Sequence, residues 1–366
     1  MDFECRTDLW EHLAGTKKTI VLYGMGNGAE KILAVCAQRG IEISAVFASD
    51  GFVRGHSFRG MPVRTWSEIK ELYGADGVIV LLAFGSSRPE VLECIDRVAR
   101  EAELYAPDVP AFGDGLFDRA FFEAHREELD AAYDLLSDAE SRKIFENVLR
   151  FKLTGDVSFL KNAESDEESV MRELVAPHEK AVTADLGAYN GDSIRALLSH
   201  ADGAIQTVYA MEPDARNFRK LEAYAKAEVR AKVLPFPVGA WDREATLYFD
   251  GSGNRNASLG ENRSSVIKDR PIRQIAVPVA PLDRILDGAP VDYIKYDVEG
   301  AEARALYGSV ESIRKYRPTL LVSLYHRNED IFSLPLLVHR LFPHYREFYL
   351  RRFRGIPAWD LNLYVK

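Results

Sequence analysis

The sequence predicts an α/β protein with two doubly wound, Rossmann-like domains joined by a helical connector. Strand-like apolar runs alternate with helical patterns in both halves of the chain, which is typical of parallel sheets with helices on both faces. A glycine-rich turn follows the first strand of each half. The 366 residues are also enough for two cores of ordinary size. We expect domains at residues 1–113 and 179–366, with the connector at 114–178.

Composition and charge limit the classes of function. The chain has 47 basic and 56 acidic residues, and the basic ones are spread out, which argues against binding to duplex nucleic acid. No apolar run approaches the length of a membrane span, and the start, "MDFECRTDLWEHL", lacks the basic segment of a signal peptide. We therefore expect a cytoplasmic protein without membrane contact. Its three cysteines lack metal or redox spacing and are predicted to be free thiols.

The elements of the first half follow from the hydrophobic pattern. Strands are expected at 19–23, 41–49 and 77–84, and helices at 29–40 and 88–102. The Leu-, Ala- and Glu-rich pattern of 121–153 predicts the helical connector. The polar, acidic stretch at 153–169 then predicts a loop.

The second half repeats the alternation of strands and helices. A Gly-, Ser- and Asn-rich segment at 251–271 predicts a loop or hairpin insertion, and two strand-like pieces at 345–353 and 359–366 end the chain. The remaining expected strands are 181–188, 207–213, 233–241, 291–300 and 318–326, and the expected helices are 193–201, 215–227, 301–316 and 335–342.

The glycine turn of the second half, "ADLGAYNGDS", predicts a ligand site. Asp185 ends a strand, at the edge where open α/β sheets bind ligands, and Gly187 and Gly191 let the backbone approach a ligand closely. The next strand ends at Glu212, whose carboxylate can accept both hydrogen bonds of a ribose diol. The alternative is structural, with a tight turn and a carboxylate that caps the next helix. Spacing alone does not separate S-adenosylmethionine from a dinucleotide.

Four segments, "ADLGAYNGDS", "AMEPDARNFRKL", "VGAWDREATLYF" and "IKYDVEGAE", together resemble the FkbM-type family of class I S-adenosylmethionine-dependent methyltransferases. The resemblance covers roughly residues 180–366 and implies a class I methyltransferase fold with S-adenosylmethionine as its cofactor. Tyr189 departs from the small residue usual in the family, so the loop of the first motif should be shaped differently. The cofactor-binding residues that the resemblance implies are Asp185, Gly187, Ala188, Tyr189, Asn190, Gly191, Ser193, Glu212, Pro213, Ala240, Trp241 and Asp242.

Acidic residues and a histidine follow the fourth and fifth strands of this half. The resemblance places methyl group and substrate together near Asp297 and Glu299. His326 is the first candidate for the base, because imidazole titrates near working pH, and a hydrogen-bonded structural histidine is the alternative. Asp297 and Glu299 are candidates for base, cofactor anchor or, with His326, a divalent-metal site. Tyr325 and Asn328 are weaker candidates, for which packing and helix capping are the alternatives.

Two further segments carry polar side chains that suit a ligand. Asn256 and Ser258, in the predicted insertion, could contact substrate if that loop closes, and a solvated hairpin is the alternative. The segment "YLRRFRG" concentrates three arginines, which suits phosphate or carboxylate recognition or a solvated run of charge.

The first glycine turn is the better match to a dinucleotide pattern but lacks reactive partners. Gly24, Gly26 and Ala29 fit G-x-G-x-x-A, and Asp50 follows the next strand where a ribose-binding acid would lie. No catalytic acid, base or nucleophile accompanies this turn. A nucleotide-sugar ligand and a scaffold without ligand remain alternatives for this domain, which resembles small domains found in front of sugar-modifying acyltransferases and some FkbM-type proteins.

The leading hypothesis is an S-adenosylmethionine-dependent methyltransferase that O-methylates a hydroxyl of a sugar, glycan precursor or related natural product. One alternative is N- or carboxyl-methylation in the same place. Another is a nucleotide-sugar or dinucleotide-dependent oxidoreductase or binding protein centred on the first domain, and a third is an assembly protein with a degenerate methyltransferase half. The expected partner is a small-molecule or glycan acceptor, and the oligomeric state is left open.

Overall fold

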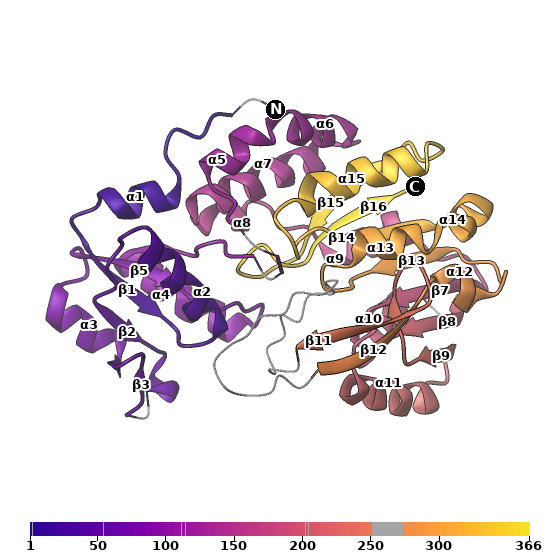
Figure 1. Ribbon diagram of the computed structural model, residues 1–366, viewed down its shortest axis with the longest axis horizontal. Helices are drawn as coiled ribbons and strands as arrows, with labels where there is room; N and C mark the ends of the chain where they lie inside the picture. The colour runs from indigo at the N-terminus through magenta and orange to yellow at the C-terminus, as the bar shows by residue number, and fades with distance from the viewer. Residues whose placement is uncertain are drawn as a thin grey trace.

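The computed structural model describes residues 1, 3–53, 55–110, 112–113, 115–201, 203, 205–250 and 274–366. Two sheets lie at opposite ends of the molecule, with the helices α5, α6 and α7 over the middle (Figure 1). The predicted fold class is therefore confirmed. No helix among these residues is both long enough and apolar enough to cross a membrane.

The N-terminal sheet has the strand order β3-β4-β2-β1-β5-β6. All its pairs are parallel except that between β3 and β4, and the order reverses between β1 and β5. Its strands are β1 Thr19–Tyr23, β2 Ala45–Phe47, β3 Ser57–Phe58, β4 Met61–Arg64, β5 Val78–Leu82 and β6 Glu103–Tyr105. Its helices are α1 Leu9–Gly15, α2 Asn27–Gln38, α3 Trp66–Tyr73 and α4 Pro89–Glu101, with the 3₁₀ turn η1 Asp50–Phe52.

The connector is mainly helical, and the loop predicted at 153–169 is interrupted by two short helices. Asp166 caps the second of them by accepting a hydrogen bond from the Ser169 amide, and Asp156 accepts one from the Ser158 amide just before the first. The connector helices are α5 Arg119–Ala124, α6 Arg126–Leu135, α7 Ala139–Thr154, α8 Ser158–Lys161 and α9 Glu167–Val170, followed by the single π-type turn η2 Met171–Val175. Helix α7 packs on β15, and α6 packs on α15.

The C-terminal sheet has the strand order β15-β16-β14-β13-β7-β8-β9. Strand β16 runs antiparallel to both of its neighbours, and the other pairs are parallel. Its strands are β7 Ala181–Leu186, β8 Ile205–Met211, β9 Lys232–Phe236, β13 Tyr293–Tyr296, β14 Thr319–Ser323, β15 Phe348–Arg352 and β16 Leu361–Val365. The strand order reverses between β7 and β13, which is where ligands of open α/β sheets bind.

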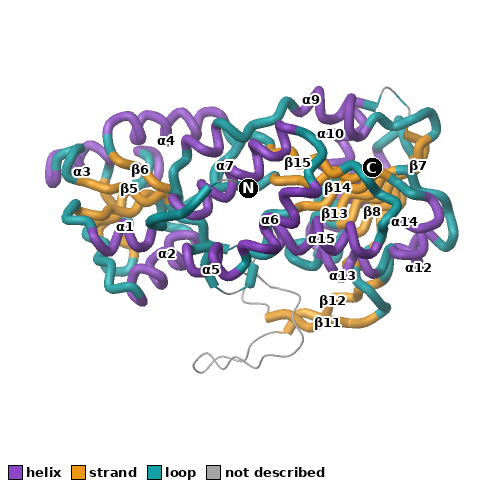
Figure 2. The backbone as a smooth tube through the Cα atoms, turned by 90° about the horizontal axis from the view of Figure 1, so that it is seen from above, coloured by secondary structure: helices purple, strands orange, loops and turns teal. Residues whose placement is uncertain are grey.

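Helices cover both faces of this sheet, with α9 and α10 on one side and α12 to α15 on the other (Figure 2). The predicted helix at 301–316 is two helices, because Gly308 lies against the Trp241 carbonyl and the chain turns there. The helix predicted at 335–342 begins earlier, at Asp330. The helices are α10 Asp192–His200, α11 Ala215–Ala227, α12 Leu282–Leu286, α13 Glu302–Tyr307, α14 Val310–Tyr316 and α15 Asp330–Leu341.

A small separate sheet has the order β10-β12-β11 and lies beside the large one (Figure 2). It contains β10 Gly239–Ala240, β11 Ala245–Asp250 and β12 Gln274–Ala280. The single strand predicted at 233–241 is thus wrong, because Pro237 has no amide hydrogen for the ladder and the chain passes from β9 to β10. The insertion predicted at 251–271 lies outside the described residues.

Candidate functional site

The turn after β7 lies directly against the chain that follows β13. Gly187 has φ of 88°, a region that favours glycine, and a Cβ there would lie 1.9 Å from the Asp297 carbonyl oxygen. Any larger residue would therefore separate the two segments. The first predicted motif and the predicted acceptor-side acid meet at one edge of the sheet.

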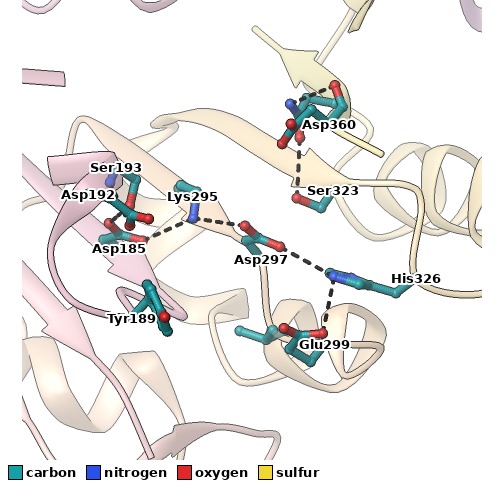
Figure 3. Close-up of polar contacts among 12 residues, drawn as sticks. Asp185, Tyr189, Asp192, Ser193, Lys295, Asp297, Glu299, Ser323, His326 and Asp360 are labelled. Atoms are coloured by element: carbon teal, nitrogen blue, oxygen red, sulfur yellow. Dashed lines mark hydrogen bonds and ion pairs between the residues drawn. The ribbon is translucent and has the colours of Figure 1, made fainter. Parts of the chain in front are cut away.

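Lys295 connects the carboxylates of these two segments (Figure 3). Its Nζ lies 3.4 Å from Asp185 Oδ1 and 3.2 Å from Asp297 Oδ2, and the other Asp185 oxygen accepts the Ser193 hydroxyl at 2.5 Å. Burial favours a lower pKa for Lys295, but the two carboxylates outweigh it and raise the pKa. Sequence reasoning overlooked Lys295, although a charged residue in an otherwise apolar strand was an available signal.

Glu212 is buried at the end of β8 and receives two backbone hydrogen bonds. Its Oε2 accepts the Tyr189 amide at 2.9 Å, and its Oε1 accepts the Asp214 amide at 2.8 Å. Burial is the main cause that raises the pKa of Glu212 to about 7. Each carboxylate oxygen keeps a second lone pair, so the capping interpretation and a ribose contact are compatible.

The loop of the first motif has an unusual backbone at Tyr189. This residue has φ of 48°, its ring is 39% exposed, and Lys220 Nζ lies 5.9 Å from the ring centroid. Asn190 Oδ1 accepts a hydrogen bond from Arg195 at 2.7 Å. Gly191 is the N-cap of α10 with φ of 84°, and a Cβ there would collide with the Tyr224 ring. Tyr189 is thus the side chain of this loop that is open to solvent.

The segment predicted to lie near adenine follows β10. Gly239 lies beside Pro213, which brings this segment next to Glu212. Trp241 is buried, its indole Nε1 has no hydrogen-bond partner among the described residues, and the Arg304 guanidinium lies 5.5 Å from its ring. Asp242 pairs with the same arginine at 2.6 Å.

His326 is buried behind Asp297, with carboxylates on both ring nitrogens. Nδ1 lies 2.8 Å from Glu302 Oε1, and Nε2 lies 3.4 Å from Asp297 Oδ1 and 3.7 Å from Glu299 Oε2. Burial favours a lower pKa, but Glu302 and then Asp297 outweigh it and raise the pKa of His326 to about 9. The imidazole therefore carries a proton at neutral pH in the ligand-free protein, so it must lose that proton before it can act as a base.

Buried groups that sequence reasoning missed or ranked low surround His326. Glu302 is 1% exposed, and its Oε1 also accepts the Val298 amide. The Tyr325 hydroxyl donates to Asp297 Oδ1 at 2.8 Å, which places this weaker candidate in the site. Asn328 is buried, and its amide atoms have no hydrogen-bond partner among the described residues.

Asp297 remains ionised in these surroundings. Burial raises its pKa, but the charges of Lys295 and His326 outweigh burial, so that its pKa lies below the usual value. No group of three or more His, Cys, Asp or Glu side chains within the described ranges is arranged to hold a metal ion. Asn256 and Ser258 lie outside those ranges.

The first glycine turn packs closely on the chain after β5. A Cβ at Gly24, where φ is 115°, would lie 2.7 Å from the Phe84 ring, and one at Gly28 would lie 2.5 Å from the Ala83 carbonyl oxygen. Packing thus explains Gly24 and Gly28, whereas Gly26 faces open space. Asp50 lies in η1, just after the next strand.

Two of the three arginines near the end of the chain have structural roles. Arg351 pairs with Asp138 at 2.6 Å, and the fully buried Arg352 donates to the Leu160 carbonyl at 2.9 Å. Both side chains fasten β15 to the connector. Arg351 and Arg352 are thus neither a solvated run of charge nor residues that recognise a ligand, because their guanidinium groups are used within the protein.

The strand order of the C-terminal sheet and the placement of its acids define a class I methyltransferase fold. Residues 185–354 match the family model of the methyltransferase FkbM domain. This part of the chain therefore matches the FkbM methyltransferase domain, as the sequence motifs predicted.

Solved structures are similar to this chain to different extents. Methyltransferase FkbM from Methylobacillus flagellatus KT has a TM-score of 0.72 and 21% identity, covering 96% of this chain and 91% of that one. An rRNA methylase from Streptococcus thermophilus (TM-score 0.34, 11% identity) covers 54% of this chain and 92% of that one. Aeropyrum pernix fibrillarin with bound S-adenosyl-L-methionine (TM-score 0.34, 11% identity) covers 54% of this chain and 73% of that one. No curated protein matches the chain.

Proposed function

We propose that this protein is an S-adenosylmethionine-dependent O-methyltransferase that acts on a hydroxyl of a sugar, glycan precursor or related natural product. The observation that carries the proposal is the contact between the first motif and the acceptor-side acid. Gly187 lies against the Asp297 carbonyl, and Lys295 lies between the carboxylates of Asp185 and Asp297. A cofactor held by the first motif would therefore present its reactive end beside Asp297.

The residues at this edge fit S-adenosylmethionine. Glu212 offers a buried carboxylate with unused lone pairs for two ribose hydroxyls. Asp185 and the loop after it would surround the amino acid part, and Trp241 and Asp242 would lie near the adenine. When bound, the cofactor supplies a methyl group on a positively charged sulfur.

Alignment of the acceptor is the larger part of the expected catalysis. Holding two reactants in line supplies about 7–11 kcal/mol, whereas a positioned general base supplies roughly 10²- to 10⁴-fold in rate. The Asp297 side chain is 26% exposed and can contact an acceptor hydroxyl, whereas the His326 side chain is only 2% exposed. We assign the hydroxyl contact to Asp297 and the neighbouring positive charge to His326. A deprotonated His326 that acts as the base is the alternative.

Calorimetry with S-adenosylmethionine on the full chain tests the cofactor assignment. We expect binding to the wild-type protein and substantial loss in Asp185→Asn and Glu212→Gln. Glu222→Gln, which changes an exposed acid of α11, is the matched control and should bind normally. Absence of binding to the wild-type chain, or equal binding by all three variants, would refute the proposal.

The metal alternative at Asp297, Glu299 and His326 needs its own measurement. Turnover is compared before and after treatment with a chelator, and after Mg²⁺ is added back. Full activity in chelator rules out a divalent ion in the mechanism, whereas loss restored by Mg²⁺ would establish one.

A nucleotide-sugar ligand at the N-terminal domain stays a prediction, for which mass spectrometry of co-purified small molecules is the direct test.

A further inference from the structure

The loop between β15 and β16 joins the two domains next to the candidate site. The Ser86 amide donates to the Ile356 carbonyl at 2.8 Å, and the Ile356 amide donates to the Ser86 carbonyl at 3.0 Å. Ser86 follows β5 of the N-terminal sheet, and Ile356 lies in the loop that leads to β16. The loop is therefore held from the N-terminal side by a backbone bridge.

Trp359 in this loop lies on the backbone of the N-terminal domain. Gly85 is so close that a Cβ there would lie 2.4 Å from the Trp359 ring. The side chain is nevertheless 45% exposed, whereas Trp10 and Trp241 are 3% and 5% exposed. One part of this indole is thus supported by the glycine backbone while another part is open to solvent.

Asp360 lies at the same sheet edge as Asp297. Because β16 runs antiparallel to β14, its beginning lies where β13 and β14 end. Asp360 directly precedes β16, and the Leu324 amide, just after β14, donates to the Leu361 carbonyl at 2.9 Å. Figure 3 shows Asp360 above the end of β14, with Ser323 between it and Asp297. Asp360 is exposed by its accessible surface, although the protein packed around its carboxyl and then the negative charge of Asp297 raise its pKa.

Charge at this edge selects against an anionic acceptor. Asp297, Glu299 and Asp360 are acidic, and the ammonium of Lys295 is already shared by Asp185 and Asp297. The positive charge of the buried His326 is likewise already paired with Glu302 and Asp297. A phosphate or carboxylate placed here would be repelled by like charges. Carboxylates do accept hydrogen bonds from neutral hydroxyl groups, and an open aromatic face packs against the C–H face of a ring.

We propose that Trp359 and Asp360 bind the methyl acceptor, and that this acceptor is a neutral sugar ring. The ring stacks on Trp359, one of its hydroxyls donates to Asp360, and another reaches Asp297. The loop at Gly85 and Ser86 supports Trp359, so the N-terminal domain is part of the acceptor site. The assignment of the acceptor rests on the proposed methyl-transfer function.

Saturation-transfer NMR on the full chain with S-adenosylhomocysteine tests this site. The probes are methyl glycosides of neutral hexoses and 6-deoxyhexoses, with hexose phosphates as the anionic comparison. We expect the neutral glycosides to bind and the phosphates to bind more weakly. Trp359→Ala should weaken glycoside binding by about tenfold or more, and Trp359→Phe by no more than about threefold, because phenyl also stacks.

Controls separate a lost acceptor site from a lost fold. Tyr73→Ala removes another exposed aromatic, at the end of α3, and should bind glycosides like the wild type. All variants should keep the wild-type affinity for S-adenosylhomocysteine. If Trp359→Ala does not fold, Asp360→Asn and Trp359→Phe carry the test, with weakened binding expected for the first and near-normal binding for the second.

Three results would overturn the assignment: no neutral glycoside binds a chain that does bind S-adenosylhomocysteine, Trp359→Ala binds glycosides unchanged, or phosphorylated sugars bind better than neutral ones. If S-adenosylhomocysteine itself fails to bind, the proposed methyl transfer is refuted. Glycoside binding that depends on Trp359 would in that case still support the sugar site.

Discussion

Glu212 should make cofactor affinity depend on pH. Its pKa is raised from the ordinary value of 4.5 to about 7, chiefly by burial, while the amides of Asp214 and Tyr189 act in the opposite direction. Near pH 7 the ligand-free protein is therefore a mixture of charged and neutral Glu212. A ribose diol donates hydrogen bonds, so it binds the charged carboxylate and should return the pKa toward its ordinary value.

Linkage converts this shift into a change in affinity. If the pKa falls from about 7 to about 4.5 on binding, the dissociation constant at pH 6 is about tenfold that at pH 8, and at pH 7 about twofold. Binding at pH 6 also releases about one proton, because nearly all of Glu212 is protonated beforehand.

Calorimetry with S-adenosylmethionine at pH 6, 7 and 8 measures the dissociation constant. Repeating it in buffers of different ionisation enthalpy measures the number of protons released on binding. The matched control is Glu212→Gln, which should bind weakly and lose this pH dependence and proton release. The amino group of the ligand titrates in both proteins, so the comparison removes its contribution. Equal affinity of the wild type at pH 6 and pH 8, or the same pH slope in Glu212→Gln, would refute the reasoning.

The same shift predicts the pH dependence of stability. The unfolded chain loses the Glu212 proton near pH 4.5, whereas the folded chain holds it to about pH 7. The folded state therefore binds more protons between these two pH values. As pH rises through this window, the contribution of Glu212 to the free energy of unfolding falls by about 3 kcal/mol in total. Urea unfolding between pH 5 and pH 8 measures the free energy of unfolding against pH. This contribution should lower the free energy as pH rises in the wild type and should be absent in Glu212→Gln.

Three further substitutions test the contacts around the site. Gly187→Ala should abolish or strongly weaken S-adenosylmethionine binding, because the new Cβ collides with the Asp297 carbonyl, whereas Gly26→Ala has open space and should bind normally; equal binding by both would contradict the close contact. His326→Ala should lower the free energy of unfolding in urea by about 3–5 kcal/mol, because Glu302 is left buried without its partner. If the methylation rate of this variant is unchanged, His326 has no part in the mechanism. Phe112→Ala should cost about 3–5 kcal/mol in the same assay, since this buried ring lies edge-on to His326 at 5.6 Å; a stability change below about 1 kcal/mol would show that the contact is loose.

The sequence alone determined the two α/β halves, the helical connector and the resemblance of the C-terminal half to FkbM methyltransferases. Strands and helices can be predicted from the sequence because the spacing of apolar residues within each segment indicates its type, whatever the rest of the chain does. The acids Asp185, Glu212 and Asp297 could also be assigned to one edge, because the ends of parallel strands meet there. Errors occurred where tertiary contacts override local pattern, as at Gly308, where the Trp241 carbonyl interrupts a helix.

Only the tertiary structure decided which side chains meet. Lys295 lies between Asp185 and Asp297, and Glu302 binds His326, although no spacing in the sequence indicates either pair. Burial sets the charge of these groups, and burial depends on segments that are far apart along the chain. Contact between Trp359 and Gly85 likewise exists because the loop before β16 is bonded to the loop after β5. Periodicity specifies which face of an element is buried, but packing of the whole chain selects its partners.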